Sequence, residues 1–275
     1  MATIPISTKG TSPKIRQALL SVSDKSGLID LARGLVRHGV NLLSTGGTYR
    51  AVREAGLPVT EISAYTGFPE MLDGRVKTLH PKIHAAILAD RDNPEHMRQL
   101  EQHGIKPIDM VVVNLYPFEK TVADPNCTFE QAIEMIDIGG PCMLRAAAKN
   151  HEFVTVVCYP SHYQQLLEQI RATGATTLKE RRSLAGTAFQ HTAMYDAAIT
   201  AYFAGYHRDL DSKLPTMDEH GFPDEMNITL KRTESLRYGE NPHQKAALYI
   251  SPDASPHALI RAPQIHGKEL SYNNY

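Results

Sequence analysis

The chain has 275 residues, 42% hydrophobic content and a formal net charge of −1, which is typical of a globular protein with a core of its own. The near-neutral charge argues against a nucleic-acid partner, since such proteins usually carry a strongly basic surface. There is no apolar run of about 18 residues to cross a membrane and no signal peptide. Cys127, Cys142 and Cys158 form no CxxC pair. We therefore expect a reduced, cytoplasmic protein.

Short apolar segments alternate with helical patterns through the first three quarters of the chain. Strands are predicted at residues 18–22, 40–43, 59–62, 108–115 and 153–158. A helix is predicted between the first two strands, ending at Gly39, and a long helix at 178–206. This alternation predicts an α/β fold with a parallel sheet, in which ligands bind beyond the carboxyl ends of the strands.

The last part of the chain has a different pattern. Pro215, Gly221, Pro223 and clustered acids predict a linker at 207–227, after a first domain at 1–206. Strands are predicted at 228–236 and 246–250. Residues 228–275 are too few to bury a core alone. We therefore expect them to be the start of a second α/β domain, truncated at Tyr275.

Two loops that follow predicted strands have the composition of an anion site. Thr45-Gly46-Gly47-Thr48 places hydroxyls and two glycines ahead of a helix, whose N-terminal N–H groups attract phosphate. A plain turn is the alternative. In Ser23-Asp24-Lys25, Ser23 or Asp24 can cap the next helix, which leaves Lys25 available for an anion.

The segment from Asp137 to Asn150 also favours an anion. It opens with an acid and two glycines, and Pro141 is expected at the first helical position. Arg145 and Lys149 then lie on one helical face without an acid four residues away to pair with. The alternative is a solvated basic helix.

Residues 74–81 place Arg75 and Lys77 on one side of a predicted extended strand, with Val76 towards the core. A solvated edge strand is the alternative. His80 and His84 lie four residues apart, but no third ligand is evident, so no metal site is predicted.

Three side chains at strand or loop ends, Asn114, Tyr116 and Asp137, are suited to binding a carboxamide. For Tyr116 the alternative is a partly buried aromatic residue beside Pro117. The anion-binding loops, the cations and these groups occur without a GxGxxG motif. Together they favour a phosphorylated heterocycle or sugar, handled without a nucleotide cofactor.

Six segments, in order, resemble the bifunctional purine biosynthesis enzymes that join IMP cyclohydrolase to phosphoribosylaminoimidazolecarboxamide formyltransferase. They are residues 21–25, 44–48, 67–71, 74–81, 114–118 and 136–150. Residues 236–244 and 267–274 resemble the opening of the formyltransferase domain. The resemblance implies a methylglyoxal-synthase-like fold for the first domain and a homodimer.

The resemblance also implies roles for individual residues, with Lys149 as the catalytic proton carrier and Tyr116 beside it. The implied nucleotide-binding residues are Ser23, Asp24, Lys25, Thr45, Gly46, Gly47, Thr48, Arg75, Val76, Lys77, Thr78, Asn114, Asp137, Ile138, Gly139, Gly140, Arg237 and Tyr238. Of these, Arg237 and Tyr238 are expected to contact the formyltransferase substrate. Cys142 stands where a small hydroxyl residue is expected.

The implied reaction closes 5-formamidoimidazole-4-carboxamide ribonucleotide to inosine monophosphate and releases water, with no metal or redox cofactor. Formyl transfer from 10-formyltetrahydrofolate is expected only of a longer chain, because the catalytic Lys-His pair and the folate site of the family fall beyond Tyr275. Two alternatives on the same fold are a regulatory module for a phosphate ligand, which needs no proton carrier, and a methylglyoxal-synthase-like lyase, which has no use for Asn114 and Asp137.

Overall fold

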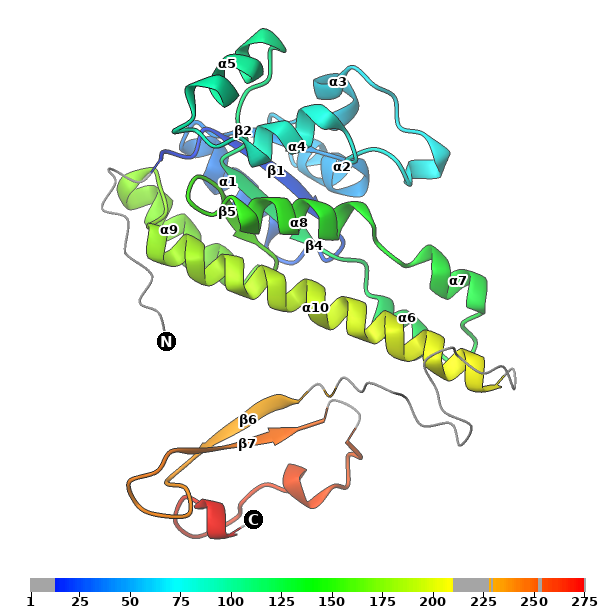
Figure 1. The fold of residues 1–275 in the computed structure, drawn as a ribbon, viewed down its shortest axis with the longest axis vertical. Helices are drawn as coiled ribbons and strands as arrows, with labels where there is room; N and C mark the ends of the chain where they lie inside the picture. Colours follow the sequence, from blue (N-terminus) through cyan, green and yellow to red (C-terminus); the bar gives the residue numbers. More distant parts are fainter. Residues whose placement is uncertain (1–12, 210–227, 229, 252–253, 275) are drawn as a thin grey trace. The chain divides into compact units, whose positions relative to one another are not determined.

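The computed structural model describes residues 13–209, 228, 230–251 and 254–274. The chain divides into two compact units, Met1–Phe203 and Ala204–Tyr275 (Figure 1). Most of the predicted linker, residues 210–227, lies outside the described residues. Its first three residues, 207–209, belong to the long helix that was expected to end at 206.

A five-stranded parallel sheet with the order β3-β2-β1-β4-β5 forms the centre of unit 1. Its strands are β1 (Gln17–Val22), β2 (Asn41–Ser44), β3 (Thr60–Glu61), β4 (Met110–Asn114) and β5 (Thr155–Val157). Leu19 of β1 pairs with Leu43 on one side and Val111 on the other, and all three are buried. Such buried apolar runs are typical of a parallel sheet covered by helices. The predicted α/β class is confirmed.

Helices surround this sheet. They are α1 (Leu28–Arg37), α2 (Gly46–Glu54), α3 (Ile62–Thr66), α4 (Pro81–Leu88), α5 (Pro94–Gln102), α6 (Phe118–Val122), α7 (Phe129–Glu134), α8 (Gly139–Lys149), α9 (Tyr163–Thr173) and α10 (Leu178–Asp209). α1 packs on α9, whereas α8 packs on α4, β4 and β5. Figure 1 shows α8 crossing in front of the sheet, with the long α10 running beside it.

The sequence of α1 explains both its burial and its end. Leu28, Leu31, Ala32 and Leu35 follow the spacing of one helical face, and all four are buried. The helix ends where Gly39 takes a φ of +73°, a left-handed conformation that glycine adopts without steric cost. The predicted end of this helix is confirmed.

The start of α8 differs from the prediction. The helix begins at Gly139, so Pro141 is its third residue and not its first. Proline is tolerated there because the first N–H groups of a helix have no partner within the helix.

Unit 2 contains an antiparallel pair of strands, β6 (Lys231–Leu236) and β7 (Ala246–Ile250). Both strands were predicted. Two short 3-10 turns follow, Leu259–Arg261 and Tyr272–Asn274. Among the described residues of this unit, Ile250 is the buried hydrophobic side chain and Ser271 is the buried polar one.

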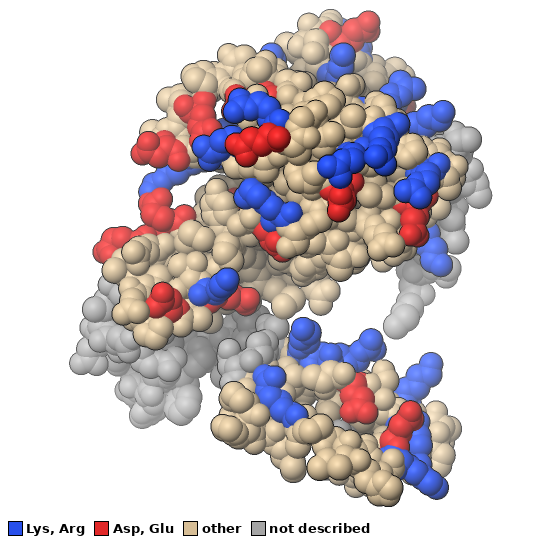
Figure 2. Space-filling model, turned by 180° about the vertical axis from the view of Figure 1, so that it is seen from behind, with Lys and Arg blue, Asp and Glu red and all other residues tan. Residues whose placement is uncertain are grey.

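Charged side chains of both signs are interspersed over the face of the molecule in Figure 2. The described residues on that face form no continuous basic surface of the kind that nucleic-acid-binding proteins carry. Within the described ranges, no helix combines the length and the apolarity that a bilayer crossing requires.

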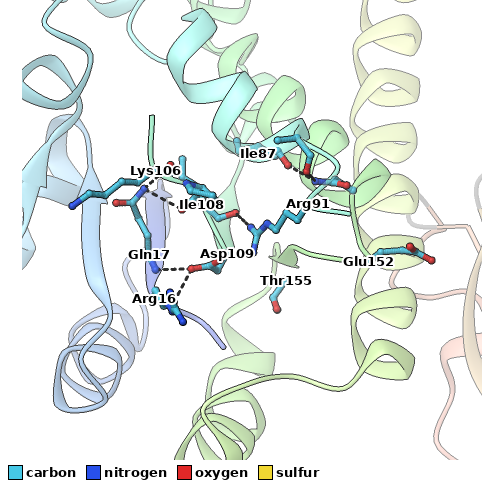
Figure 3. Close-up of polar contacts among 12 residues, drawn as sticks. Arg16, Gln17, Ile87, Arg91, Lys106, Ile108, Asp109, Glu152 and Thr155 are labelled. Carbon is cyan, nitrogen blue, oxygen red and sulfur yellow. Dashed lines mark hydrogen bonds and ion pairs between the residues drawn. The ribbon is translucent and has the colours of Figure 1, made fainter. Parts of the chain in front are cut away.

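At the amino edge of the sheet, one carboxylate holds the starts of β1 and β4 together (Figure 3). Asp109 Oδ2 accepts the backbone N–H groups of Arg16 and Gln17 at 2.7 and 2.8 Å. Its Oδ1 accepts from Arg91 at 2.6 Å, and Arg91 also donates to the carbonyl of Ile108 at 2.9 Å. Because Asp109 is buried, these bonds replace the water that the carboxylate loses.

Asp109→Ala is expected to lower the free energy of unfolding by about 3–5 kcal/mol. The substitution breaks a buried ion pair and leaves the charge of Arg91 without its carboxylate. Asp30→Ala is the control, since the Asp30 and Arg33 side chains are 83% and 43% exposed and such pairs contribute about 0–1 kcal/mol. Urea denaturation measures both variants. Equal losses would show that the buried cluster adds no stability.

Candidate functional site

A pocket of about 350 Å³ lies at the carboxyl edge of the sheet in unit 1. The loops after β1, β2 and β4 form its walls, together with the N-terminal ends of α2 and α8. β1 and β4 are neighbours, although β2 and β3 lie between them in the sequence. Ligands of open α/β sheets bind at such a reversal of strand order, and the volume suits a small molecule, for which about 300–1,000 Å³ is usual.

Most of the predicted binding residues line this pocket. They are Ser23, Lys25, Thr45, Gly46, Gly47, Thr48, Arg75, Lys77, Thr78, Asn114, Tyr116, Asp137, Ile138, Gly139 and Gly140. Asp24 and Val76 do not line it, and neither does Lys149. Arg237 and Tyr238 belong to unit 2, where the Arg237 guanidinium lies 4.8 Å from the Tyr238 ring centre.

Two lysines approach the N-terminus of α2. A Cβ atom on Gly46 would lie 3.3 Å from Lys77 Nζ, and one on Gly47 would lie 3.6 Å from Lys25 Nζ. Gly46 has a φ of +54°, which disfavours any other residue there. Free N–H groups of a helix start and two ammonium groups therefore surround one point of the pocket, an arrangement that attracts a phosphate. This geometry favours the predicted anion site over a plain turn.

Thr48 has a structural task in place of the predicted side-chain contact with the ligand. Its hydroxyl accepts the Val22 N–H at 2.9 Å and donates to the Val22 carbonyl at 3.0 Å. The side chain is buried. Thr48 therefore fastens α2 to the end of β1, and only its backbone N–H remains at the helix start.

Asn114 is largely committed to the protein, although it lines the pocket and keeps one Nδ2 proton for the carboxamide contact that the sequence predicts. Its Oδ1 accepts the N–H groups of Ser23 and Asp24 at 2.6 and 2.8 Å, and its Nδ2 donates to the Asp24 carbonyl at 3.1 Å. It thus joins the loops that follow β1 and β4.

Neither Ser23 nor Asp24 caps α1, whose N-cap is Gly27 without a side-chain bond. The Asp24 carboxylate instead accepts the hydroxyl and the N–H of Ser26 at 2.6 and 2.9 Å. These two bonds lower the pKa of Asp24.

The predicted strand around Arg75 is wrong. Leu72, Asp73 and Gly74 all have positive φ, and a bridge between Met71 and Val76 closes a tight loop. Successive residues of such a loop do not alternate between two faces, so Val76 is only half-buried and does not reach the core.

Both cations of this loop nevertheless reach the pocket, each paired with an acid. Arg75 forms an ion pair with Glu134, at the end of α7. Lys77 Nζ lies 3.5 Å from Glu70 Oε1, and its side chain is 23% exposed.

The start of α8 is crowded. A Cβ on Gly139 would lie 2.5 Å from Thr78 Oγ1, and one on Gly140 would lie 2.7 Å from Leu115 Cδ2. Glycine at both positions lets the helix start approach the wall of the pocket, where the Gly140 N–H donates to Asp137 Oδ1 at 2.8 Å.

Burial raises the pKa of Asp137, opposed by hydrogen bonds from the Gly140 and Tyr116 N–H groups and by the charge of Lys77. The Asp137 carboxyl therefore binds a proton more readily than an exposed aspartate, yet it lies beside a cation in a pocket. This combination is characteristic of groups that exchange protons with a substrate.

Lys149 lies at the other end of α8. The helix leads from the carboxyl edge back to the amino edge, where the Thr155 N–H at the start of β5 donates to the carbonyl of Asp109. Lys149 follows Gly139 by ten positions in α8, about 15 Å along the helix axis. Within one chain, the geometry gives no support to Lys149 as the catalytic proton carrier, and Lys77 lies closer to the ligand site.

Two residues of the site carry no signal in the sequence. Glu134 lines the pocket, and Tyr195 of α10 reaches the backbone of Asp137 from 58 residues away. Only the folded chain brings these residues to the site.

The surroundings of His80 and His84 indicate that these side chains support the fold. His80 Nδ1 accepts the Lys82 N–H at the start of α4, and burial lowers the pKa of His84. No group of three or more potential metal ligands occurs in the part of the chain that the structure describes.

The chain is similar to two protein families. The family described as AICARFT/IMPCHase bienzyme matches residues 147–275, and the MGS-like domain matches residues 27–142. The crystal structure of ForH is similar over 69% of this chain and 99% of ForH, with 36% sequence identity and a TM-score of 0.61.

Asp137→Asn is expected to change how stability depends on pH. In the wild type, the raised pKa contributes stability that is complete below the usual value of 3.8 and is lost as the pH rises through the folded-state pKa. The variant lacks this loss. The free energy of unfolding, variant minus wild type, should therefore become more positive between about pH 4 and pH 8. Urea denaturation tests this, with the exposed Asp30→Asn as control; a constant difference would contradict it.

Proposed function

The chain belongs to the AICARFT/IMPCHase bienzyme family, whose members are enzymes of purine biosynthesis, and on that basis we propose that its pocket is an IMP cyclohydrolase site. The reaction closes 5-formamidoimidazole-4-carboxamide ribonucleotide to inosine monophosphate and water. One observation carries the proposal: a phosphate-binding helix start and a carboxyl group of raised pKa lie in the same pocket.

The phosphate is proposed to bind at the start of α2. The N–H groups of Gly46 and Gly47 and the ammonium of Lys25 attract a dianion there. The hydroxyl of Thr45, which does not cap α2 and belongs to a residue that lines the pocket, is a further donor. Anchoring the phosphate fixes the ribonucleotide and directs the heterocycle towards α8.

Ring closure begins when the carboxamide nitrogen attacks the formyl carbon. Negative charge then develops on the formyl oxygen, and it is stabilised by the Lys77 ammonium, which lies between the start of α2 and Asp137 and acts on the Asp137 charge. Asp137 accepts a proton from the attacking nitrogen and returns it to the formyl oxygen. The second proton comes from the formamido nitrogen as the oxygen departs, so that one proton from each nitrogen leaves with it as water.

Tyr116 is proposed to donate a hydrogen bond to the heterocycle or its oxyanion. Its side chain is 41% exposed and lines the pocket beside Asp137. The homodimer, the contacts of Arg237 and Tyr238 with a formyltransferase substrate, and the use of 10-formyltetrahydrofolate stay predictions of the family resemblance.

An assay with the formamido nucleotide tests the proposal, with inosine monophosphate followed by absorbance. Many turnovers per protein molecule are expected. Tight binding of the nucleotide without turnover would indicate the regulatory module. Release of methylglyoxal from dihydroxyacetone phosphate, with no ring closure, would indicate the lyase.

The pocket predicts that Lys77 contributes more to turnover than Lys149. Lys77→Ala should lower kcat about 10²- to 10³-fold, the usual cost of removing one donor to an oxyanion. Lys149→Ala should lower kcat less than about tenfold, because its side chain lies outside the pocket. Steady-state kinetics of both variants decide between the two lysines. A loss confined to Lys149→Ala would overturn the role of Lys77.

Glu134→Gln is expected to lower KM about two- to fivefold. The ion pair with Glu134 competes with substrate for Arg75, and exposed pairs of this kind contribute about 0.2–1 kcal/mol. Glu130→Gln, one turn earlier on α7, removes the same charge from a residue outside the pocket and should leave KM unchanged. An unchanged or higher KM in Glu134→Gln would show that the pair does not compete.

A further inference from the structure

Tyr195 links the long helix α10 to the segment between α7 and α8. Its hydroxyl accepts the Asp137 N–H at 2.8 Å and donates to the Met135 carbonyl at 2.9 Å. The side chain is buried, and its ring contacts Phe118 edge to face with 6.2 Å between ring centres. Tyr195 itself does not line the pocket.

The other backbone bonds of the segment held by Tyr195 are local, since the Ile136 N–H donates to the Ile133 carbonyl and the Ile138 carbonyl accepts from Cys142. Residues 136–138 belong to neither helix. The N–H of Asp137 has the Tyr195 hydroxyl as its hydrogen-bond acceptor in the described structure. The Asp137 side chain is fixed separately, through the N–H groups of Gly140 and Tyr116. The position of this carboxyl therefore depends both on these side-chain bonds and on the backbone bond to Tyr195, which comes from outside the pocket.

We infer that Tyr195 is a positioning residue that holds the Asp137 carboxyl in place for proton transfer, an inference that rests on the proposed function. A catalytic group has to stay within about 0.5 Å of its productive position. The two bonds of one hydroxyl fix the backbone on both sides of Ile136. Through the buried side chain of Tyr195, α10 gives this short segment a support from outside its own helices.

The environment keeps the Tyr195 hydroxyl in its protonated form. Burial raises the pKa of Tyr195 to about 12, with smaller contributions from the charges of Asp137 and Asp196 and from Tyr116. The O–H is therefore present throughout the neutral range and can always donate to Met135.

Tyr195→Phe tests the inference, because it removes the hydroxyl and keeps the ring against Phe118. We expect kcat to fall about 10- to 100-fold, the scale of loss for a catalytic group misplaced by about 1 Å. KM and the Kd of inosine monophosphate should change less than about threefold, because the start of α2 is untouched. Thermal unfolding establishes that the variant is folded.

Tyr159→Phe is the matched control. It also removes a tyrosine hydroxyl that is bonded to α10, here to His191 at 3.0 Å, and Tyr159 is neither in the pocket nor bonded to a residue that lines it. Its kcat should stay within about twofold of the wild type. A kcat loss equal to that of Tyr195→Phe would assign both effects to general loosening of α10 and overturn the inference.

A second measurement separates this inference from the proposed function. The pKa of the Asp137 carboxyl is followed by carbon NMR in the wild type and in Tyr195→Phe. Because burial is the main cause of its raised value, freeing the segment should lower that pKa. If the wild type shows no ring closure, the proposed function fails, and the NMR result alone decides the role of Tyr195. An unchanged pKa together with an unchanged kcat overturns the positioning role while the cyclohydrolase stands.

Discussion

The Asn114 amide joins the two loops at the point where the sheet reverses its strand order, and the pocket depends on this contact. Parallel pairing brings the ends of β1 and β4 together. The loops that follow these strands form one side of the pocket only if hydrogen bonds join them. Asn114 accepts two backbone N–H groups and donates to one carbonyl of the loop that contains Ser23 and Asp24. Lys25 is thereby directed to the start of α2.

Two helix starts meet at this wall, and the positive end of α8 faces the Asp137 carboxylate while that of α2 faces the pocket. The N-terminus of α8 stabilises the ionised form of Asp137 through the Gly140 N–H, while burial opposes ionisation more strongly. Lys25 and Lys77 lie at the N-terminus of α2, where Lys77 pairs with Glu70, a residue that does not line the pocket. A dianionic ligand therefore gains most at α2, and a proton gains most at Asp137.

The sequence predicted the parts of this site that follow from local pattern and missed the parts that follow from folding at long range. Buried strands that end in polar loops predicted the sheet and most of the residues that line the pocket, because the carboxyl ends of parallel strands meet at one edge. Pattern failed at Arg75, where positive φ values make a loop. The role of Lys149 came from the family resemblance and stays a prediction, although the residue does not line the pocket. Tyr195 had no local signal, since its partner lies 58 residues away.

The two edges of the sheet differ in role, since the amino edge carries a buried hydrogen-bonded cluster and the carboxyl edge carries the pocket. At the amino edge, Asp109 has three donors for its two oxygens, so its burial is compensated. At the carboxyl edge, burial disfavours the charge of Asp137, and the Thr45 hydroxyl makes no capping bond to α2. The desolvation of a carboxyl group at a ligand site lowers stability, as is common where a protein keeps a functional group buried. The hydrogen bonds of Asp109 at the amino edge offset this loss of stability, because β1 and β4 run from one edge of the sheet to the other.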